Sequence, residues 1–264
     1  MTANDDSAIE PRPTHVLLEL CCGGIKDVLL AARHNVERIE LNTAMALGGL
    51  TPTAALMAAA RREFSGPIIA MLRPREGGFC YSNNEFNLML DDARRLRDLG
   101  ADGFATGFLK SDGSLDDARF SALRTAVPDC ELVCHRAFDI VSSRDAAMEQ
   151  LVDCGIQRVL TSGGAAIAIE GARELRRLNA LAAGRIEILA GGGVRAANVR
   201  QLTASSGCRQ VHSSAQSVVD ESLPMNSSGL HFGVHGKADG SYVACDESTL
   251  RELMAELELV NGRW

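Results

Sequence analysis

The stretch Leu132-Val133-Cys134-His135-Arg136-Ala137-Phe138-Asp139 decides how the rest of the chain is interpreted. It begins as an apolar run of the length of a buried strand, and it then presents a cysteine, a histidine, an arginine and an aspartate within six positions. The carboxyl ends of parallel strands, and the loops that follow them, are where α/β folds place their chemistry. We interpret the stretch as a strand that opens into a binding site. The alternative is a strand whose polar residues only begin the next helix.

Short apolar runs alternate with segments of helical spacing along the whole chain. Strict alternation predicts parallel strands joined by helical crossovers. Eight such units in about 250 residues favour a closed (β/α)8 TIM barrel of the α/β class, with an open doubly wound sheet as the alternative. The expected strands are 15–20, 37–42, 67–72, 103–109, 131–135, 158–161, 185–190 and 209–212. The expected helices are 51–64, which starts at Thr51-Pro52, and 25–34, 84–99, 116–127, 143–154, 167–183, 196–205 and 247–259.

The domain organisation follows from this alternation. Residues 15–264 are expected to form a single barrel domain, and the polar segment 1–14, with Pro11 and Pro13, is expected to be a disordered tail. The connection 217–246 after the eighth strand is unusually long, and loops of this length are usually functional or disordered. We expect it to lie over the barrel mouth as a lid or an interface element.

Composition excludes two classes of partner. The chain has 264 residues and a formal net charge of −7, and no basic block or aromatic–basic stripe indicates nucleic-acid binding. No apolar run approaches the roughly 18 residues that cross a membrane. The eight cysteines are scattered without a Cys-x-x-Cys pair, and the first residues lack the apolar core of a signal peptide. This usage predicts reduced thiols in a cytoplasmic protein.

Charged side chains gather at the expected strand ends. Glu19 and Glu40 lie inside the first two strands, where a buried charge is costly unless it is paired, and we expect partners among Arg73, Arg75 and Arg136. A histidine or a glutamate of this group can serve as general base, and arginines can clamp an anion. The alternative is a structural ion-pair network that fills the barrel top. The candidate catalytic residues are Glu19, Glu40, Arg73, His135, Arg136 and Asp139.

Glycines and serines follow the sixth, seventh and eighth expected strands. In TIM barrels the last of these loops often bind phosphate through backbone amides and short hydroxyl side chains. The alternative is a set of tight turns without a ligand. The candidate phosphate-binding residues are Ser162, Gly163, Gly191, Gly192, Gly193, Ser213 and Ser214.

The pair Cys21-Cys22 at the end of the first strand is a candidate metal site, with His135 as the candidate third ligand. Soft thiolates select Cu(I) or Zn(II). Neighbouring residues of a regular strand face opposite sides, so both sulfurs can point inward only if the backbone bends there.

Nine short motifs are spread over the chain after residue 14. They are Leu18-Glu19-Leu20-Cys21-Cys22, Arg38-Ile39-Glu40-Leu41, Gly48-Gly49-Leu50-Thr51-Pro52, Arg73-Pro74-Arg75, Phe79-Cys80-Tyr81-Ser82, His135-Arg136-Ala137-Phe138-Asp139, Arg158-Val159-Leu160-Thr161-Ser162-Gly163, Gly191-Gly192-Gly193-Val194 and Val211-His212-Ser213-Ser214-Ala215. In order and spacing they resemble the CutC family. The resemblance implies a cytoplasmic (β/α)8 barrel that forms homodimers or larger homo-oligomers. It also implies a role in copper homeostasis, with Cu(I) bound at cysteines near the first two strands.

Two positions depart from the family pattern. Asn42 stands where many relatives carry a cysteine, which removes half of a two-thiolate copper site and leaves Cys21-Cys22 alone. The segment Glu76-Gly77-Gly78-Phe79 replaces the usual Gly-Gly-Asp-Phe. Two hypotheses therefore stand side by side. The chain is either a Cu(I)-binding protein or a TIM-barrel enzyme for a small anionic or phosphorylated substrate, so its partner is a metal ion or a small anionic ligand.

Overall fold

The computed structural model describes residues 15–220 and 240–262, so the expected tail 1–14 and the segment 221–239 lie outside the described residues. Eight parallel strands close into a barrel in which each strand is hydrogen-bonded to the next and β8 to β1. They are β1 (Leu17–Cys22), β2 (Arg38–Leu41), β3 (Ile68–Met71), β4 (Gly103–Thr106), β5 (Glu131–Cys134), β6 (Arg158–Thr161), β7 (Glu187–Gly191) and β8 (Gln210–Ser213). The closed order confirms the (β/α)8 prediction and excludes the open sheet.

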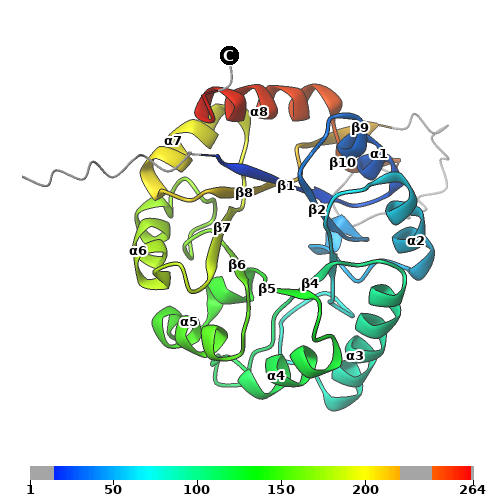
Figure 1. Cartoon of the computed structure of the whole chain (residues 1–264), viewed down its shortest axis with the longest axis vertical. Helices are drawn as coiled ribbons and strands as arrows, with labels where there is room; N and C mark the ends of the chain where they lie inside the picture. The colour runs from blue at the N-terminus through cyan, green and yellow to red at the C-terminus, as the bar shows by residue number, and fades with distance from the viewer. Residues whose placement is uncertain (1–14, 221–239, 263–264) are drawn as a thin grey trace, which may run out of the picture.

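Within the described residues, eight α-helices surround the barrel (Figure 1). They are α1 (Ile25–Arg33), α2 (Ala54–Glu63), α3 (Asn83–Asp98), α4 (Asp117–Ala126), α5 (Arg144–Asp153), α6 (Ala172–Ala182), α7 (Ala196–Ser206) and α8 (Glu247–Val260). Two 3-10 helices, η1 (Met45–Leu47) and η2 (Arg136–Ile140), follow β2 and β5.

The start of α2 differs from the expectation. The cap is Thr53, whose side chain accepts the amide hydrogen of Leu56 at 3.1 Å. Thr51 is used elsewhere, because its hydroxyl accepts the amide hydrogen of Arg73 at 2.9 Å. Both threonines can cap an orphan amide, so the sequence pattern alone did not separate them.

Apolar side chains form two layers of core. Alternate residues of β1, namely Leu18, Leu20 and Cys22, belong to the large cluster between strands and helices. A smaller cluster fills the barrel interior and comes from β3 to β7; it consists of Ile69, Met71, Ala105, Val133, Leu160 and Leu189. The side of the interior bounded by β8, β1 and β2 holds none of these residues.

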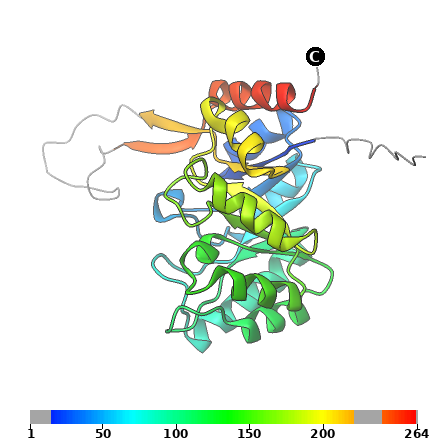
Figure 2. The same ribbon diagram turned by 90° about the vertical axis from the view of Figure 1, so that its left-hand side faces the viewer.

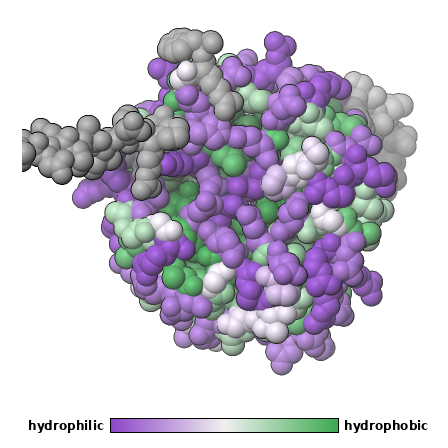
Figure 3. Space-filling view, viewed as in Figure 1, coloured by the Kyte–Doolittle hydropathy of each residue, from purple (hydrophilic) through white to green (hydrophobic). Residues whose placement is uncertain are grey.

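Charged and polar groups occupy that side of the interior. Glu19, Arg38 and Glu40 are buried in β1 and β2, and His212 lies beside Glu19 in the parallel register of β8. Figure 3 shows hydrophilic residues over the middle of the face that it displays. The barrel interior therefore has an apolar half and a polar half, and the polar half contains the ionisable side chains of β1, β2 and β8.

The connection after β8 is partly ordered into strands, which corrects the expectation of a loop over 217–246. The strands β9 (Gln216–Asp220) and β10 (Ser241–Cys245) pair antiparallel, and Figure 2 shows the hairpin projecting from one side of the barrel. Its base is held by Asp27, whose carboxylate accepts the amide hydrogen of Cys245 at 3.0 Å. Within the described part of the chain, no helix has the length and apolar character needed to cross a membrane.

Candidate functional site

A cavity of about 420 Å³ opens at the carboxyl ends of the strands. Its walls include many of the residues expected there: Cys21, Glu40, Arg73, His135, Arg136, Gly192, Gly193, Ser213 and Ser214. Other expected residues do not line it: Glu19, Cys22, Asp139, Ser162, Gly163 and Gly191. The structure thus brings together residues of six strand ends, those of β1, β2, β3, β5, β7 and β8, in a single cavity, and it assigns the others to supporting positions.

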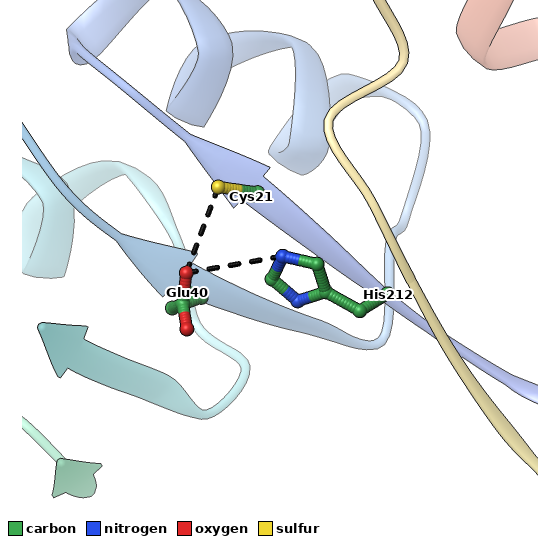
Figure 4. Close-up of side chains that lie close together, drawn as sticks. All are labelled: Cys21, Glu40 and His212. Carbon is green, nitrogen blue, oxygen red and sulfur yellow. Dashed lines mark hydrogen bonds and ion pairs between the residues drawn. The ribbon is translucent and has the colours of Figure 1, made fainter. Parts of the chain in front are cut away.

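The side chains of Cys21, Glu40 and His212 point toward one another in this cavity (Figure 4). The Cys21 thiol donates to Oε2 of Glu40 at 3.6 Å, and Nε2 of His212 lies 3.9 Å from the same oxygen. One ligand atom from each of the three residues lies within 4.8 Å of the other two. A sulfur, an oxygen and a nitrogen at this separation can coordinate one metal ion.

A second sulfur lies next to this cluster. Sδ of Met45, on η1, is 3.9 Å from Sγ of Cys21. Gly23 makes room for it, because a Cβ there would lie 2.4 Å from Cγ of Met45. Asn42 completes the corner, and its amide nitrogen is 3.4 Å from the sulfur and 2.8 Å from Oε2 of Glu40.

Glu19 is paired differently from the expectation, which was wrong in naming Arg73, Arg75 or Arg136. Its carboxylate accepts from Nε of Arg38 at 2.6 Å and lies 2.8 Å from Nδ1 of His212. Both partners stand opposite Glu19 in the register of the neighbouring strands. The cause is geometric, because the inward side chain of a middle strand position reaches its lateral neighbours before it reaches the mouth.

The three expected arginines are held by other groups. Arg73 donates to the carbonyl oxygens of Leu47, Gly48, Gly49 and Gly77. Its guanidinium carbon also lies 5.3 Å from the centroid of the Phe79 ring. Arg75 pairs with Glu85 at 2.5 Å outside the cavity. Arg136 pairs with Asp139 at 2.8 Å. Glu40 therefore has His212 and Asn42 as its polar neighbours instead of an arginine.

The electrostatics of the cluster separate its two carboxylates. Burial opposes ionisation of Glu19, but the His212 hydrogen bond and the Arg38 charge lower the pKa of Glu19 to about 2. Burial raises the pKa of Glu40, and the charge of Glu19 adds to this effect. Burial lowers the pKa of His212, yet the carboxylates of Glu40 and Glu19 outweigh it and raise that pKa. Burial, followed by the Glu40 charge, raises the pKa of the Cys21 thiol well above its usual range.

His135, the candidate third metal ligand and candidate base, does not join this cluster. Its Nδ1 accepts the amide hydrogen of Ala137 at 3.1 Å, and its ring packs on Phe79 with centroids 4.7 Å apart. Burial and the charge of Arg73 lower the pKa of His135 to about 3, so the ring is neutral at pH 7. Because Nδ1 accepts a hydrogen bond, the proton of the neutral ring is on Nε2, which has no partner among the described residues.

Cys22 faces away from the cavity. β1 stays regular to its end, so Cys22 packs in the layer between strands and helices, and its thiol donates to the carbonyl of Leu20 at 3.7 Å. The two adjacent cysteines therefore differ in environment. Cys21 is the one that faces the candidate ligands.

Asp139 organises the loop after β6. Its carboxylate accepts from the Thr161 hydroxyl at 2.5 Å, from the Ser162 amide at 3.2 Å and from the Gly164 amide at 3.0 Å. The Gly163 amide donates to the Thr161 hydroxyl at 2.9 Å. These donors already have an internal acceptor, so Ser162 and Gly163 support the loop.

Three members of the site were not among the candidate site residues of the sequence analysis. His212 stands at the expected end of the last strand, which the predicted barrel brings to the same mouth, but its contact with Glu19 depends on the register of β8 against β1. Met45 lies in a segment without strand or helix periodicity, so its proximity to Cys21 had no signal. Arg38 did carry a signal, because it stands two positions before Glu40 and so shares its face of the strand.

Comparisons with known proteins agree with this architecture. Residues 16–217 match the CutC family. A CutC family protein of Treponema denticola is 38% identical over 219 residues, which are 83% of this chain and 89% of that protein. A CutC family protein of Chromobacterium violaceum is 35% identical over 242 residues, which are 92% of this chain and 98% of that protein.

Solved structures give the same grouping. The crystal structure of a CutC protein from Streptococcus agalactiae, whose name proposes a role in copper homeostasis, superimposes with a TM-score of 0.73 at 30% identity over 75% of this chain and 98% of that chain. A phosphoribosylanthranilate isomerase from Thermotoga maritima superimposes with a TM-score of 0.56 at 10% identity over 92% of this chain and 98% of that chain, which shows a shared fold only. By sequence and by structure, the chain belongs to the CutC family.

Proposed function

We propose that this protein binds Cu(I) at the corner of the cavity where Cys21, Met45 and His212 meet. The observation that carries the proposal is the donor set, since a thiol, a thioether and an imidazole are the soft and borderline ligands that Cu(I) prefers. The name of the Streptococcus agalactiae relative points in the same direction.

Orphaned oxygens at the same corner fit a cation. Oε1 of Glu40 and Oδ1 of Asn42 are buried, and neither has a hydrogen-bond partner in the described part of the structure. A buried acceptor without a partner costs free energy, and a nearby cation offsets that cost. Cys21, Met45 and His212 would hold the ion, which supplies Lewis acidity and one-electron chemistry when bound.

The chain's own groups orient the ligands. Glu19 fixes the His212 ring through Nδ1, which leaves Nε2 toward Cys21 and Glu40. A carboxylate behind a ligating histidine is the usual support of metal sites. The Cys21 thiol donates its hydrogen to Oε2 of Glu40. Glu40 is therefore placed to accept the proton when the thiol becomes a thiolate on binding metal.

The state of the cysteines supports a cytoplasmic location. All eight are free thiols, and a reducing compartment keeps thiols available for a soft metal. We infer that the protein handles copper in the cytoplasm.

Anaerobic titration with Cu(I) against a chromophoric chelator tests the proposal. The Cys21→Ser variant should lose more than about 100-fold in affinity, since removal even of outer supports costs 10–100-fold. The matched control is Cys22→Ser, which removes the adjacent sulfur on the other face of β1 and should leave affinity unchanged. Equal losses in both variants, or a preference for Zn(II) over Cu(I), would show that the assignment is wrong.

A further inference from the structure

The wall of the cavity that is formed by the segments after β7 and β8 has a different chemistry from the sulfur corner. Gly192, Gly193 and Val194, between β7 and α7, line the cavity together with Ser214, which follows β8. Among the described residues, their four amide N–H groups have no acceptor. The Ser214 hydroxyl likewise has no partner within that part of the chain.

The carbonyl oxygens of the same turn are all used internally. Gly192 accepts from the Ala168 amide at 2.8 Å, Gly193 from the Asn198 side chain at 2.9 Å, and Val194 from the Ser213 hydroxyl at 2.8 Å. The carbonyl oxygens of the turn thus have hydrogen-bond donors, whereas its amide N–H groups have no acceptor among the described residues. Successive free amides of this kind form an anion-binding concavity.

The lining is also positively charged. Three arginines, Arg73, Arg136 and Arg195, face one carboxylate, Glu40, although the whole chain has a net charge of −7. Within the described ranges, no carboxylate pairs with Arg73 or Arg195. A Cβ at Gly192 would lie 3.3 Å from Nη1 of Arg136, so that guanidinium lies beside the free amides.

Two buried donors on the other wall point to an oxygen-bearing ligand independently of the turn. Arg73 is 8% exposed and its Nε has no partner, and His135 is 4% exposed with Nε2–H unpartnered, in the part of the chain that the structure describes. Both side chains line the same cavity. Buried donors left without acceptors in a cavity wall are costly, and ligand oxygens remove that cost.

We propose that the cavity binds a small phosphorylated molecule, with the phosphate on the amides of Gly192, Gly193 and Val194, on Ser214 and on Arg195. Further oxygens of the ligand would reach toward Arg73 and His135. The volume of about 420 Å³ suits a molecule of metabolite size. This phosphate site replaces the wider expected set, because Ser162, Gly163 and Ser213 already serve internal bonds. The proposal goes beyond copper binding and does not depend on it.

Thermal unfolding of the metal-free protein with inorganic phosphate is the test, at constant ionic strength against chloride. Phosphate at 10 mM should raise the melting temperature by about 3 °C for a Kd near 1 mM. Arg195→Gln and Ser214→Asp should weaken phosphate binding by about tenfold or more, as expected for charge-assisted contacts. Both variants should keep the circular dichroism of the parent, which separates lost binding from lost folding.

Two controls keep the result specific. Arg200→Gln removes an arginine of α7, the helix that Arg195 precedes, from outside the cavity and should keep the phosphate shift. Cys21→Ser should also keep it, so failure of copper binding and failure of phosphate binding are distinguishable. Glycerol 3-phosphate should bind more tightly than phosphate, and glycerol should not bind. A shift no larger than that of chloride, equal loss in Arg200→Gln, or binding of glycerol would overturn the proposal.

Discussion

Asn42 is the residue at which the proposed copper site can be strengthened. Its amide nitrogen lies 3.4 Å from Sγ of Cys21, and the residue is buried beside Glu40. A cysteine is smaller than asparagine, so Asn42→Cys places a second sulfur at the same corner without overpacking. A second thiolate should raise Cu(I) affinity by about tenfold or more, measured by chelator competition.

Asn42→Ser serves as the control, because it removes the amide and adds no soft ligand. Its Cu(I) affinity should stay within about threefold of the parent. If Asn42→Cys gains no more than Asn42→Ser, the proposed placement of the copper site beside Cys21 is wrong.

His135 should make stability depend on pH. Its pKa is about 3 in the folded chain and about 6.5 when unfolded, so between these values the unfolded chain binds a proton that the folded chain does not. Its contribution is therefore present above pH 6.5 and is lost as the pH falls below it. At pH 5 the loss is about 2 kcal/mol.

Urea unfolding of the parent and of His135→Asn at pH 7 and pH 5 isolates this effect. The asparagine oxygen can accept the Ala137 amide hydrogen in place of Nδ1. The variant should lose about 2 kcal/mol less than the parent between the two pH values. Parallel losses in both proteins would mean that His135 is protonated in the folded state.

At the scale of elements, the turn after β1 determines where η1 places the sulfur of Met45. Gly23 would place a Cβ 2.4 Å from Cγ of Met45, whereas a Cβ at Gly24 meets nothing within 4 Å. Gly23→Ala should therefore displace Met45 from Cys21 and lower Cu(I) affinity to the level of Met45→Leu.

Gly24→Ala is the matched control one residue away, where the backbone is extended and accepts any side chain. Its Cu(I) affinity should equal that of the parent in the same titration. An unchanged affinity in Gly23→Ala would remove Met45 from the ligand set.

The elements themselves were predictable, and the contacts between them only in part. Periodicity and turn residues located every barrel strand, and they placed Cys21, Glu40 and His135 at strand ends facing one cavity. The partners of Glu19 were missed, because they depend on the register of β2 and β8, which no local pattern encodes. The hairpin of β9 and β10 was missed because its strands are short and flank a segment rich in glycine and serine.

Across the whole molecule, a line of polar contacts runs from the starts of β5, β6 and β7 to the polar half of the barrel. It begins with Arg158, which pairs with Glu131 and Glu187, both at 3.2 Å. Gln210 links Glu187 to Arg38 through bonds of 2.6 and 2.5 Å. Arg38 then pairs with Glu19, which holds His212. The strand starts are thus connected to the candidate copper corner by hydrogen-bonded groups.

The Glu19–Arg38 pair should be the most sensitive point of this line for global stability. The side chains are 2% and 6% exposed, and they join β1 to β2. Arg38→Met leaves the Glu19 carboxylate buried beside an apolar group, and breaking a buried pair in this way costs about 3–5 kcal/mol. Arg185→Met breaks an exposed pair with Glu149 at 2.6 Å and should cost less than about 1 kcal/mol.

Urea unfolding measures the loss of stability in both variants. The double change Glu19→Gln with Arg38→Met should recover part of the loss seen in Arg38→Met, because no uncompensated charge remains. Equal costs for the two arginines would mean that water reaches Glu19 and that the polar half of the barrel is not sealed.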